Sequence, residues 1–275
     1  MLGRTLQRHF RHHEVFIADL PEVDITDGRS IGQAVAAFRP DVVIHCAAMT
    51  QVDACETDPD TAYRINALGS AYVAQAAARQ GARMIAISTD YVFDGLSDRP
   101  YHEFDCPAPK TVYGASKRAG EQAVQAHCPD HTIVRIAWLY GEGGPSFVHT
   151  MLRLGAQTGD PLKVVNDQIG NPTSTDAVAG LIAQLLEKPI PGVVHGTCEG
   201  EATWNEFAHA IFRSARLTRG LESCTTADFP RPAPRPANSR LEKRVLRLAG
   251  LLPMPHWEEA LERFMRQTEL AQKNG

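Results

Sequence analysis

The stretch Met84-Ile85-Ala86-Ile87-Ser88-Thr89-Asp90 decides the fold, because four apolar residues lead directly into a polar cluster. A short continuous apolar run is typical of a strand in a parallel sheet that helices cover on both faces. In open α/β sheets, ligands bind in the crevice beyond the carboxyl ends of the strands. The sequence therefore predicts an α/β fold with a doubly wound parallel sheet, and a ligand site at Thr89 and Asp90.

A second motif follows at Tyr113 and Lys117, inside Val112-Tyr-Gly-Ala-Ser-Lys-Arg-Ala-Gly-Glu121. If this segment is helical, the two side chains are i,i+4 neighbours on one face. A free phenol has a pKa of about 10, and a nearby ammonium lowers it, which suits a general acid for a carbonyl under reduction. A Tyr and a Lys four residues apart are usually ordinary helix-surface residues. The polar strand end upstream favours instead a proton-delivery unit of Thr89, Tyr113 and Lys117, in which Thr89 bonds the carbonyl oxygen.

The remaining patterns predict alternating strands and helices along the chain. Predicted strands lie at residues 14–19, 41–48, 132–138, 162–165 and 192–195. Predicted helices lie at residues 30–38, 60–80, 113–127, 147–158, 176–187, 204–215 and 256–267.

These motifs together resemble the extended short-chain dehydrogenase/reductase superfamily, and within it the dTDP-4-dehydrorhamnose reductase family. The resemblance runs to about Met265 and rests on several words in the right order: Ser88-Thr-Asp-Tyr-Val-Phe-Asp-Gly95, Asn166-Asp-Gln-Ile-Gly-Asn-Pro-Thr173 and Arg235-Pro-Ala-Asn-Ser-Arg-Leu241. It implies a Rossmann-type dinucleotide-binding domain over residues 1–145. It also implies a smaller α+β, mainly substrate-binding lobe over residues 146–275, with segments that return to the first domain.

The resemblance further implies NADPH- or NADH-dependent reduction of the C4 keto group of dTDP-4-dehydro-β-L-rhamnose to dTDP-L-rhamnose, a step of polysaccharide biosynthesis. Tyr113 would protonate the sugar oxygen, Lys117 would hold the nicotinamide ribose, and Thr89 would bond the sugar. Two alternatives stay open. One is a non-catalytic regulatory subunit of this fold, of the type that regulates a methionine adenosyltransferase. The other is an epimerase or dehydratase for another nucleotide sugar, since those enzymes share the Tyr–Lys motif.

Cofactor contacts are predicted from the resemblance and from one strand end. Asp19 closes the predicted strand at residues 14–19, where an acid bonds the adenosine ribose 2′-hydroxyl and favours NADH. Family members use either cofactor, so the preference stays open. The other predicted contacts, besides Tyr113 and Lys117, are Met1, Leu2, Gly3, Asp24, Ile25, Ala47, Ala48, Met49, Thr50, Asn66 and Ile87. Asp24 is also suited to capping the next helix, and Asn66 to supporting the active-site strand.

The first residues do not follow the family pattern completely. Gly3 matches the third glycine of the family's glycine-rich turn, whereas the first two glycines and the first strand have no counterpart. A start at an internal methionine of a longer gene product is favoured over a natural short form, because every later motif survives.

Substrate contacts are predicted at strand ends and in a proline-rich stretch of the second half. Tryptophan is usually a core residue, and a stretch with four prolines is usually a linker. Position beside the site and the resemblance favour substrate contacts instead, at Thr89, Asp90, Trp138, Gln168, Asn238 and Arg240.

The composition of the chain argues against several other classes of protein. A net charge of −4 and a pI near 6.3 argue against a general nucleic-acid surface. No stretch approaches the ~20 apolar residues of a membrane span, and the first residues lack a signal-peptide core. Six cysteines without a CxxC pair suit a reducing cytoplasm. Some members of the family dimerise and bind magnesium, so a homodimer is possible, but the sequence shows no spacing of metal ligands.

Overall fold

The computed structural model describes residues 1–273 and contains a central sheet of four parallel strands. The strands lie in the order β1 (Val42–His45), β2 (Arg83–Thr89), β3 (His131–Ile136) and β8 (Gly192–His195). Their spatial order follows their order in the chain, and a helix lies between each consecutive pair in sequence. This confirms the predicted parallel α/β sheet, and it places the polar end of β2 between two neighbouring strands.

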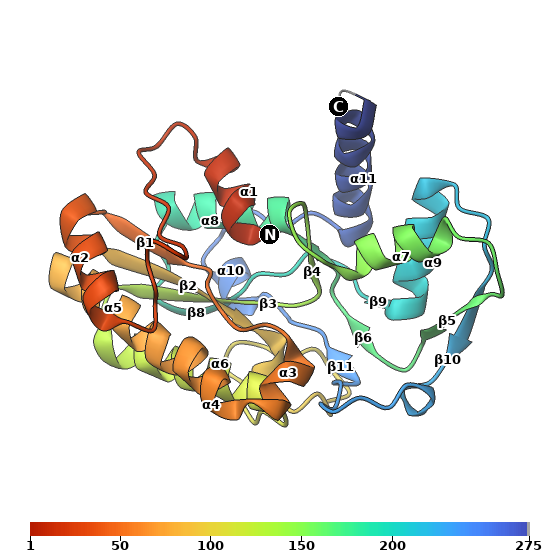
Figure 1. Cartoon of the computed structure of the whole chain (residues 1–275), viewed down its shortest axis with the longest axis horizontal. Coiled ribbons are helices and arrows are strands. Elements are labelled where there is room, and N and C mark those ends of the chain that lie inside the picture. Colours follow the sequence, from red (N-terminus) through yellow and green to blue (C-terminus); the bar gives the residue numbers. More distant parts are fainter. Residues whose placement is uncertain (274–275) are drawn as a thin grey trace.

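Helices cover both faces of the sheet (Figure 1). Side chains of β2 alternate between the faces, so that Met84 and Ala86 belong to one apolar cluster and Ile85 to the other. The first face carries α2 (Gly28–Phe38), α5 (Ser70–Gln80) and α6 (Val112–His127). The second face carries α1 (Leu2–His9), α8 (Thr175–Glu187) and α10 (Arg244–Leu248).

The second half of the chain builds a separate group of short strands and helices beside the sheet (Figure 1). It contains α7 (Phe147–Gly155), β5 (Leu162–Val165), α9 (Trp204–Ala215), β10 (Leu221–Cys224) and α11 (Trp257–Lys273). Two-residue strands connect it internally: β4 (Leu139–Tyr140) with β7 (Thr173–Ser174), and β6 (Ile169–Gly170) with β9 (Ala202–Thr203) and β11 (Asn238–Ser239). From this half, α8 and β8 return to the main sheet.

The predicted strand at residues 14–19 is wrong. These residues form an irregular segment, and the side chains of Val15, Phe16 and Ile17 are 46, 47 and 55% exposed. An apolar segment becomes a strand only when a neighbour satisfies its backbone hydrogen bonds. Within residues 1–273, no strand lies beside this segment, and β1 is the edge of the sheet.

The predicted helix at residues 60–80 is interrupted. It consists of α4 (Pro59–Tyr63), a π-helical segment η1 (Arg64–Gly69) and α5. π-Segments often occur at functional sites, and this one contains Asn66. The other short helices are α3 (Val52–Thr57), η2 (Asp90–Val92) and η3 (Thr226–Asp228).

Two predicted helices end at other residues than expected. The helix predicted at residues 147–158 ends at Gly155, and the final helix continues past residue 267 to Lys273. The last two residues of the predicted 146–275 lobe lie outside the described part of the chain. Across residues 1–273, no helix combines the length and the apolar character that a membrane crossing requires.

Candidate active site

The carboxyl end of β2 and the first turns of α6 lie against each other. Thr111 begins α6, since its hydroxyl accepts a hydrogen bond from the Gly114 amide at 3.0 Å. A Cβ atom at Gly114 would collide with the carbonyl oxygen of Tyr91, just after β2. The absence of a side chain at Gly114 therefore lets the helix approach the strand end, and Tyr113 comes close to Thr89.

Tyr113 and Thr89 are both buried, with 8% and 5% of their surfaces exposed. Burial raises the pKa of the Tyr113 phenol above its usual range, and interaction with the Thr89 hydroxyl offsets part of that rise. The Thr89 hydroxyl donates to the Asp90 carboxylate at 3.0 Å. Burial also raises the pKa of Asp90 to about 6, although Ser239 and Thr89 offset part of this effect.

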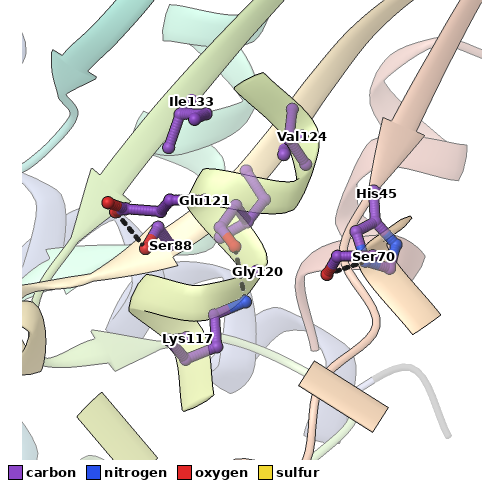
Figure 2. Close-up of a pocket in the computed structure, with 10 residues that line it drawn as sticks. His45, Ser70, Ser88, Lys117, Gly120, Glu121, Val124 and Ile133 are labelled. Atoms are coloured by element: carbon purple, nitrogen blue, oxygen red, sulfur yellow. Dashed lines mark hydrogen bonds between the residues drawn. The ribbon is translucent and has the colours of Figure 1, made fainter. Parts of the chain in front are cut away.

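Lys117 lies one turn further along α6, and its ammonium donates to the Ile87 carbonyl of β2 at 2.8 Å (Figure 2). Burial lowers the pKa of Lys117 to about 8, whereas the nearby Glu121 carboxylate raises it. The sequence predicts that Lys117 lowers the pKa of Tyr113. In the structure burial outweighs any such effect, and the lysine bonds the strand backbone.

Glu121 joins this site although the sequence reasoning missed it. Its carboxylate accepts hydrogen bonds from the Ser88 hydroxyl at 2.6 Å and from the Arg135 guanidinium at 2.8 Å through two nitrogens. Arg118 adds a further bond at 2.8 Å. Two signals were available in the sequence: Glu121 is four residues after Lys117, and Arg135 interrupts an otherwise apolar strand.

Asn66 holds the turn after β1 against α6. Its side-chain oxygen accepts from the Met49 amide at 2.8 Å, and its side-chain nitrogen donates to the Met49 carbonyl and to the Ser116 hydroxyl. With a surface that is 0% exposed, Asn66 has the partners that a buried amide needs. It therefore supports the predicted cofactor turn from behind.

A small cavity of about 10 Å³ lies behind Lys117 (Figure 2). It is lined by His45 and Ser70 on one side and by Ser88 and Glu121 on the other, and the His45 ring contacts the Ser70 hydroxyl at 3.1 Å. Its volume is close to the minimum that holds one water molecule.

The predicted cofactor residues other than Asn66, Tyr113 and Lys117 fall into two groups. Met49 and Ile87 lie at the site, together with Ala47, Ala48 and Thr50 in the turn that follows β1. The other six residues contact neighbouring parts of the protein. Met1 lies beside Gly144, Leu2 lies in the core and Gly3 lies in α1. Asp24 is bonded to Thr26, Ile25 packs against Gly69, and the exposed Asp19 accepts a hydrogen bond from the Leu20 amide. A ribose contact by Asp19 stays a prediction.

The site fits a dinucleotide cofactor at its Lys117 side. The ammonium has three donors, and among the described residues the Ile87 carbonyl takes one of them. The other two suit vicinal ribose hydroxyls. Ala47 and Ala48 leave the backbone after β1 open to close approach, and Ala47 is exposed.

Two predicted substrate residues, Trp138 and Gln168, both contact Trp204, which the sequence placed only at the start of the helix predicted at residues 204–215. The rings of Trp138 and Trp204 stack with centroids 3.5 Å apart, and Gln168 accepts a hydrogen bond from the Trp204 indole at 3.0 Å. Trp138 adopts a left-handed φ of 47°, which is unusual for a tryptophan and is typical of functional sites. Gly170 gives it room, since a Cβ there would meet the Trp138 ring at 2.5 Å.

The polar groups of Asn238 and Arg240 form hydrogen bonds with other residues of the protein. The Asn238 side chain donates to the carbonyls of Ser97 and Arg99 and accepts from the Arg240 guanidinium. Arg240 also donates to the Asp98 carbonyl at 2.7 Å. In the structure these two residues hold the loop at 97–99, and substrate contact stays a prediction.

Comparisons with known proteins show the family of this chain. The family described as "RmlD substrate binding domain" matches residues 1–270. The spore coat polysaccharide biosynthesis protein SpsK of Bacillus subtilis is 42% identical, over 98% of this chain and 95% of that protein. A dTDP-4-dehydrorhamnose reductase of Streptomyces griseus is 44% identical, over 95% of this chain and 88% of that protein.

Solved structures agree with these relatives. A dTDP-4-dehydrorhamnose reductase from Bacillus anthracis in complex with NADP superimposes with a TM-score of 0.94 and 42% identity, covering 97% of this chain and 95% of that one. This chain thus shares its fold with a relative whose structure was solved in complex with NADP. The chain therefore belongs to the RmlD family, the dTDP-4-dehydrorhamnose reductase family to which its sequence motifs point.

Proposed function

We propose that this protein uses NADPH or NADH to reduce the C4 keto group of dTDP-4-dehydro-β-L-rhamnose, yielding dTDP-L-rhamnose. The observation that carries the proposal is the placement of Thr89, Tyr113 and Lys117 around one point at the carboxyl end of β2. The choice of sugar nucleotide is based on the names of the relatives. These names also favour a reductase over a regulatory subunit, an epimerase or a dehydratase.

The residues divide the work of one proton transfer. A nicotinamide cofactor, when bound, would supply the hydride for C4. Tyr113 donates its phenolic proton to the sugar oxygen as negative charge develops there, and the Thr89 hydroxyl turns its hydrogen from the Asp90 carboxylate to the same oxygen. The Lys117 ammonium stabilises the resulting phenolate, because a positive charge favours the ionised phenol.

The substrate lobe adds orientation in this proposal. Trp138, held in its left-handed conformation against Trp204, forms an apolar wall for the sugar ring, and Gln168 fixes the second indole. Residues 1–145 act as the dinucleotide-binding domain and residues 146–275 mainly as the substrate lobe. In this proposal the protein acts in the cytoplasm as a homodimer. Light scattering of the purified protein tests whether it is a dimer.

The decisive experiment follows NADPH oxidation with the 4-keto sugar nucleotide for the wild type and for Tyr113→Phe. We expect turnover in the variant to fall by about 10²- to 10⁴-fold, the usual contribution of a general acid. Sugar-nucleotide binding, measured by calorimetry, should persist, since the ring remains. Tyr63→Phe, at an exposed tyrosine of α4, is the matched control and should keep full activity.

Two results would contradict the proposal. If the wild-type protein binds the sugar nucleotide but oxidises no NADPH, a regulatory subunit would be favoured. Wild-type turnover in Tyr113→Phe would remove the tyrosine from the mechanism.

A further inference from the structure

Glu121 carries a buried charge that the proposed reaction does not use directly. It follows Lys117 by one turn on α6, and Tyr113, Lys117 and Glu121 share one helix face at i, i+4 and i+8. Only 3% of its surface is exposed. Glu121 accepts hydrogen bonds from three side chains, which come from β2, β3 and its own helix.

The contacts of this helix face join α6 to the end of β2 at two successive residues. Lys117 bonds the Ile87 carbonyl at 2.8 Å, and Glu121 accepts from the Ser88 hydroxyl at 2.6 Å. The next strand residue is Thr89, and the preceding helix turn carries Tyr113. The distance between these two hydroxyls therefore depends on how α6 is held on β2.

We propose that Glu121 is a positioning residue of the reductase site: through Ser88 it sets Thr89 opposite Tyr113, and its negative charge keeps Lys117 in the ammonium form. This inference rests on the proposed reductase function. It assigns Glu121 no contact with substrate or cofactor.

The charges around Lys117 support the second part. From β1 and the turn after it, the lysine is faced by His45 and Cys46, and on its own helix by Tyr113 and Glu121. Burial and the neighbouring Lys117 lower the pKa of His45 to about 3, so that ring is neutral near pH 7. Burial raises the pKa of Cys46 to about 12, so the thiol is neutral as well. Among these groups, Glu121 is the one that is negatively charged.

Arg135 keeps Glu121 ionised. The guanidinium approaches both carboxylate oxygens at 2.8 Å, and these interactions hold the pKa of the carboxyl below its usual value despite burial. Buried ion pairs are often no more stabilising than apolar residues of the same volume. Under the proposal, this cluster supplies the negative charge beside Lys117.

Glu121→Gln tests the proposal, because it keeps the shape and removes the charge. We expect kcat to fall about tenfold or more, because small misplacements of reacting groups lower the rate by at least this much. KM for the sugar nucleotide should change little. The alkaline limb of the rate should move to lower pH. NADPH affinity, titrated by fluorescence, should begin to weaken at a lower pH than in the wild type.

Ser88→Ala separates the two parts of the proposal. Removal of the hydroxyl should lower kcat and leave the alkaline limb in place, since no charge changes. Glu187→Gln, at an exposed glutamate that ends α8, is the matched control and should change neither property.

A Glu121→Gln protein that loses thermal stability but keeps the wild-type kcat and alkaline limb would overturn the proposal and leave a structural role alone. If that variant does not fold, wild-type kcat in folded Ser88→Ala overturns the positioning role. An inactive wild type would instead contradict the proposed function itself, so the two failures are distinguishable.

Discussion

Lys117 is the residue whose charge state most directly limits the proposed reaction. Burial places its pKa at about 8, well below that of a free lysine. The ammonium form therefore predominates below this pH and is lost as the pH rises through it. We predict that kcat/KM falls on the alkaline side with a midpoint near 8. In Lys117→Arg, whose guanidinium stays protonated, residual activity should show no such limb. A limb that persists unchanged in Lys117→Arg would assign it to another group.

Residues with a spacing signature could be predicted from the sequence, whereas residues defined by partners could not. A strand end and an i,i+4 pair identified Thr89, Tyr113 and Lys117, because local geometry fixes where such side chains point. Glu121 and Trp204 gain their roles from side chains on other elements. Asn238 and Arg240 show the same limit, because the sequence did not indicate that their polar groups are bonded to the loop at 97–99, and their contact with substrate stays a prediction.

At the scale of elements, the close approach of α6 to η1 is the contact that holds the site together. A Cβ atom at Gly120 would collide with the Asn66 carbonyl oxygen, and that carbonyl is already bonded by the Ser70 hydroxyl at 2.7 Å. Glycine therefore lets the two helices meet at backbone distance. The same contact keeps Asn66 near Met49 and Ser116.

We predict that Gly120→Ala lowers the free energy of unfolding by about 1–3 kcal/mol, the usual cost of overpacking. It should also reduce kcat, because α6, which carries Tyr113 and Lys117, must shift away from η1. Gly180→Ala is the matched control: it lies in α8 with no atom within 4 Å of the added methyl group. There, alanine should stabilise the helix by up to about 1 kcal/mol. Urea denaturation of both variants measures the difference, and equal stabilities would contradict the packing argument.

Elements were predicted well where the signal is contained in one segment. The helix with Tyr113 and Lys117 and the apolar strand before Thr89 match α6 and β2. Residues 14–19 have the same kind of apolar run, but a strand also requires a neighbouring strand. The π-segment at residues 64–69 carries no recognised local signal, and it lies where the Asn66 carbonyl closely approaches Gly120 of another helix.

At the scale of the whole molecule, both edge strands of the main sheet end in a buried histidine. His45 closes β1 and contacts the Ser70 hydroxyl, and His195 closes β8 and contacts the Glu242 carbonyl at 3.0 Å. Burial is the main reason that the pKa of each ring falls to about 3, and a neighbouring cation lowers it further. The folded protein thus keeps both rings neutral over a pH range in which the unfolded chain protonates them.

The sign of the resulting pH dependence follows from this difference. Below the unfolded pKa of about 6.5, the unfolded state binds more protons, so stability falls as the pH falls towards 3. Each histidine contributes about 1.4 kcal/mol per pH unit in that window. Asp90 acts in the opposite direction, because its raised pKa of about 6 favours the folded state as the pH falls from 6 towards the unfolded value.

We therefore predict a net loss of about 3 kcal/mol in the free energy of unfolding between pH 7 and pH 5, since two histidines outweigh one aspartate. Urea denaturation at pH 7, 6 and 5 measures it. His45→Gln, which can still bond Ser70, and His195→Gln should each remove about half of the histidine contribution. His12→Gln, at an exposed histidine, should leave the loss unchanged. If stability were constant from pH 7 to pH 5, or if only His12→Gln altered the slope, the buried rings would not be the groups that take up the protons.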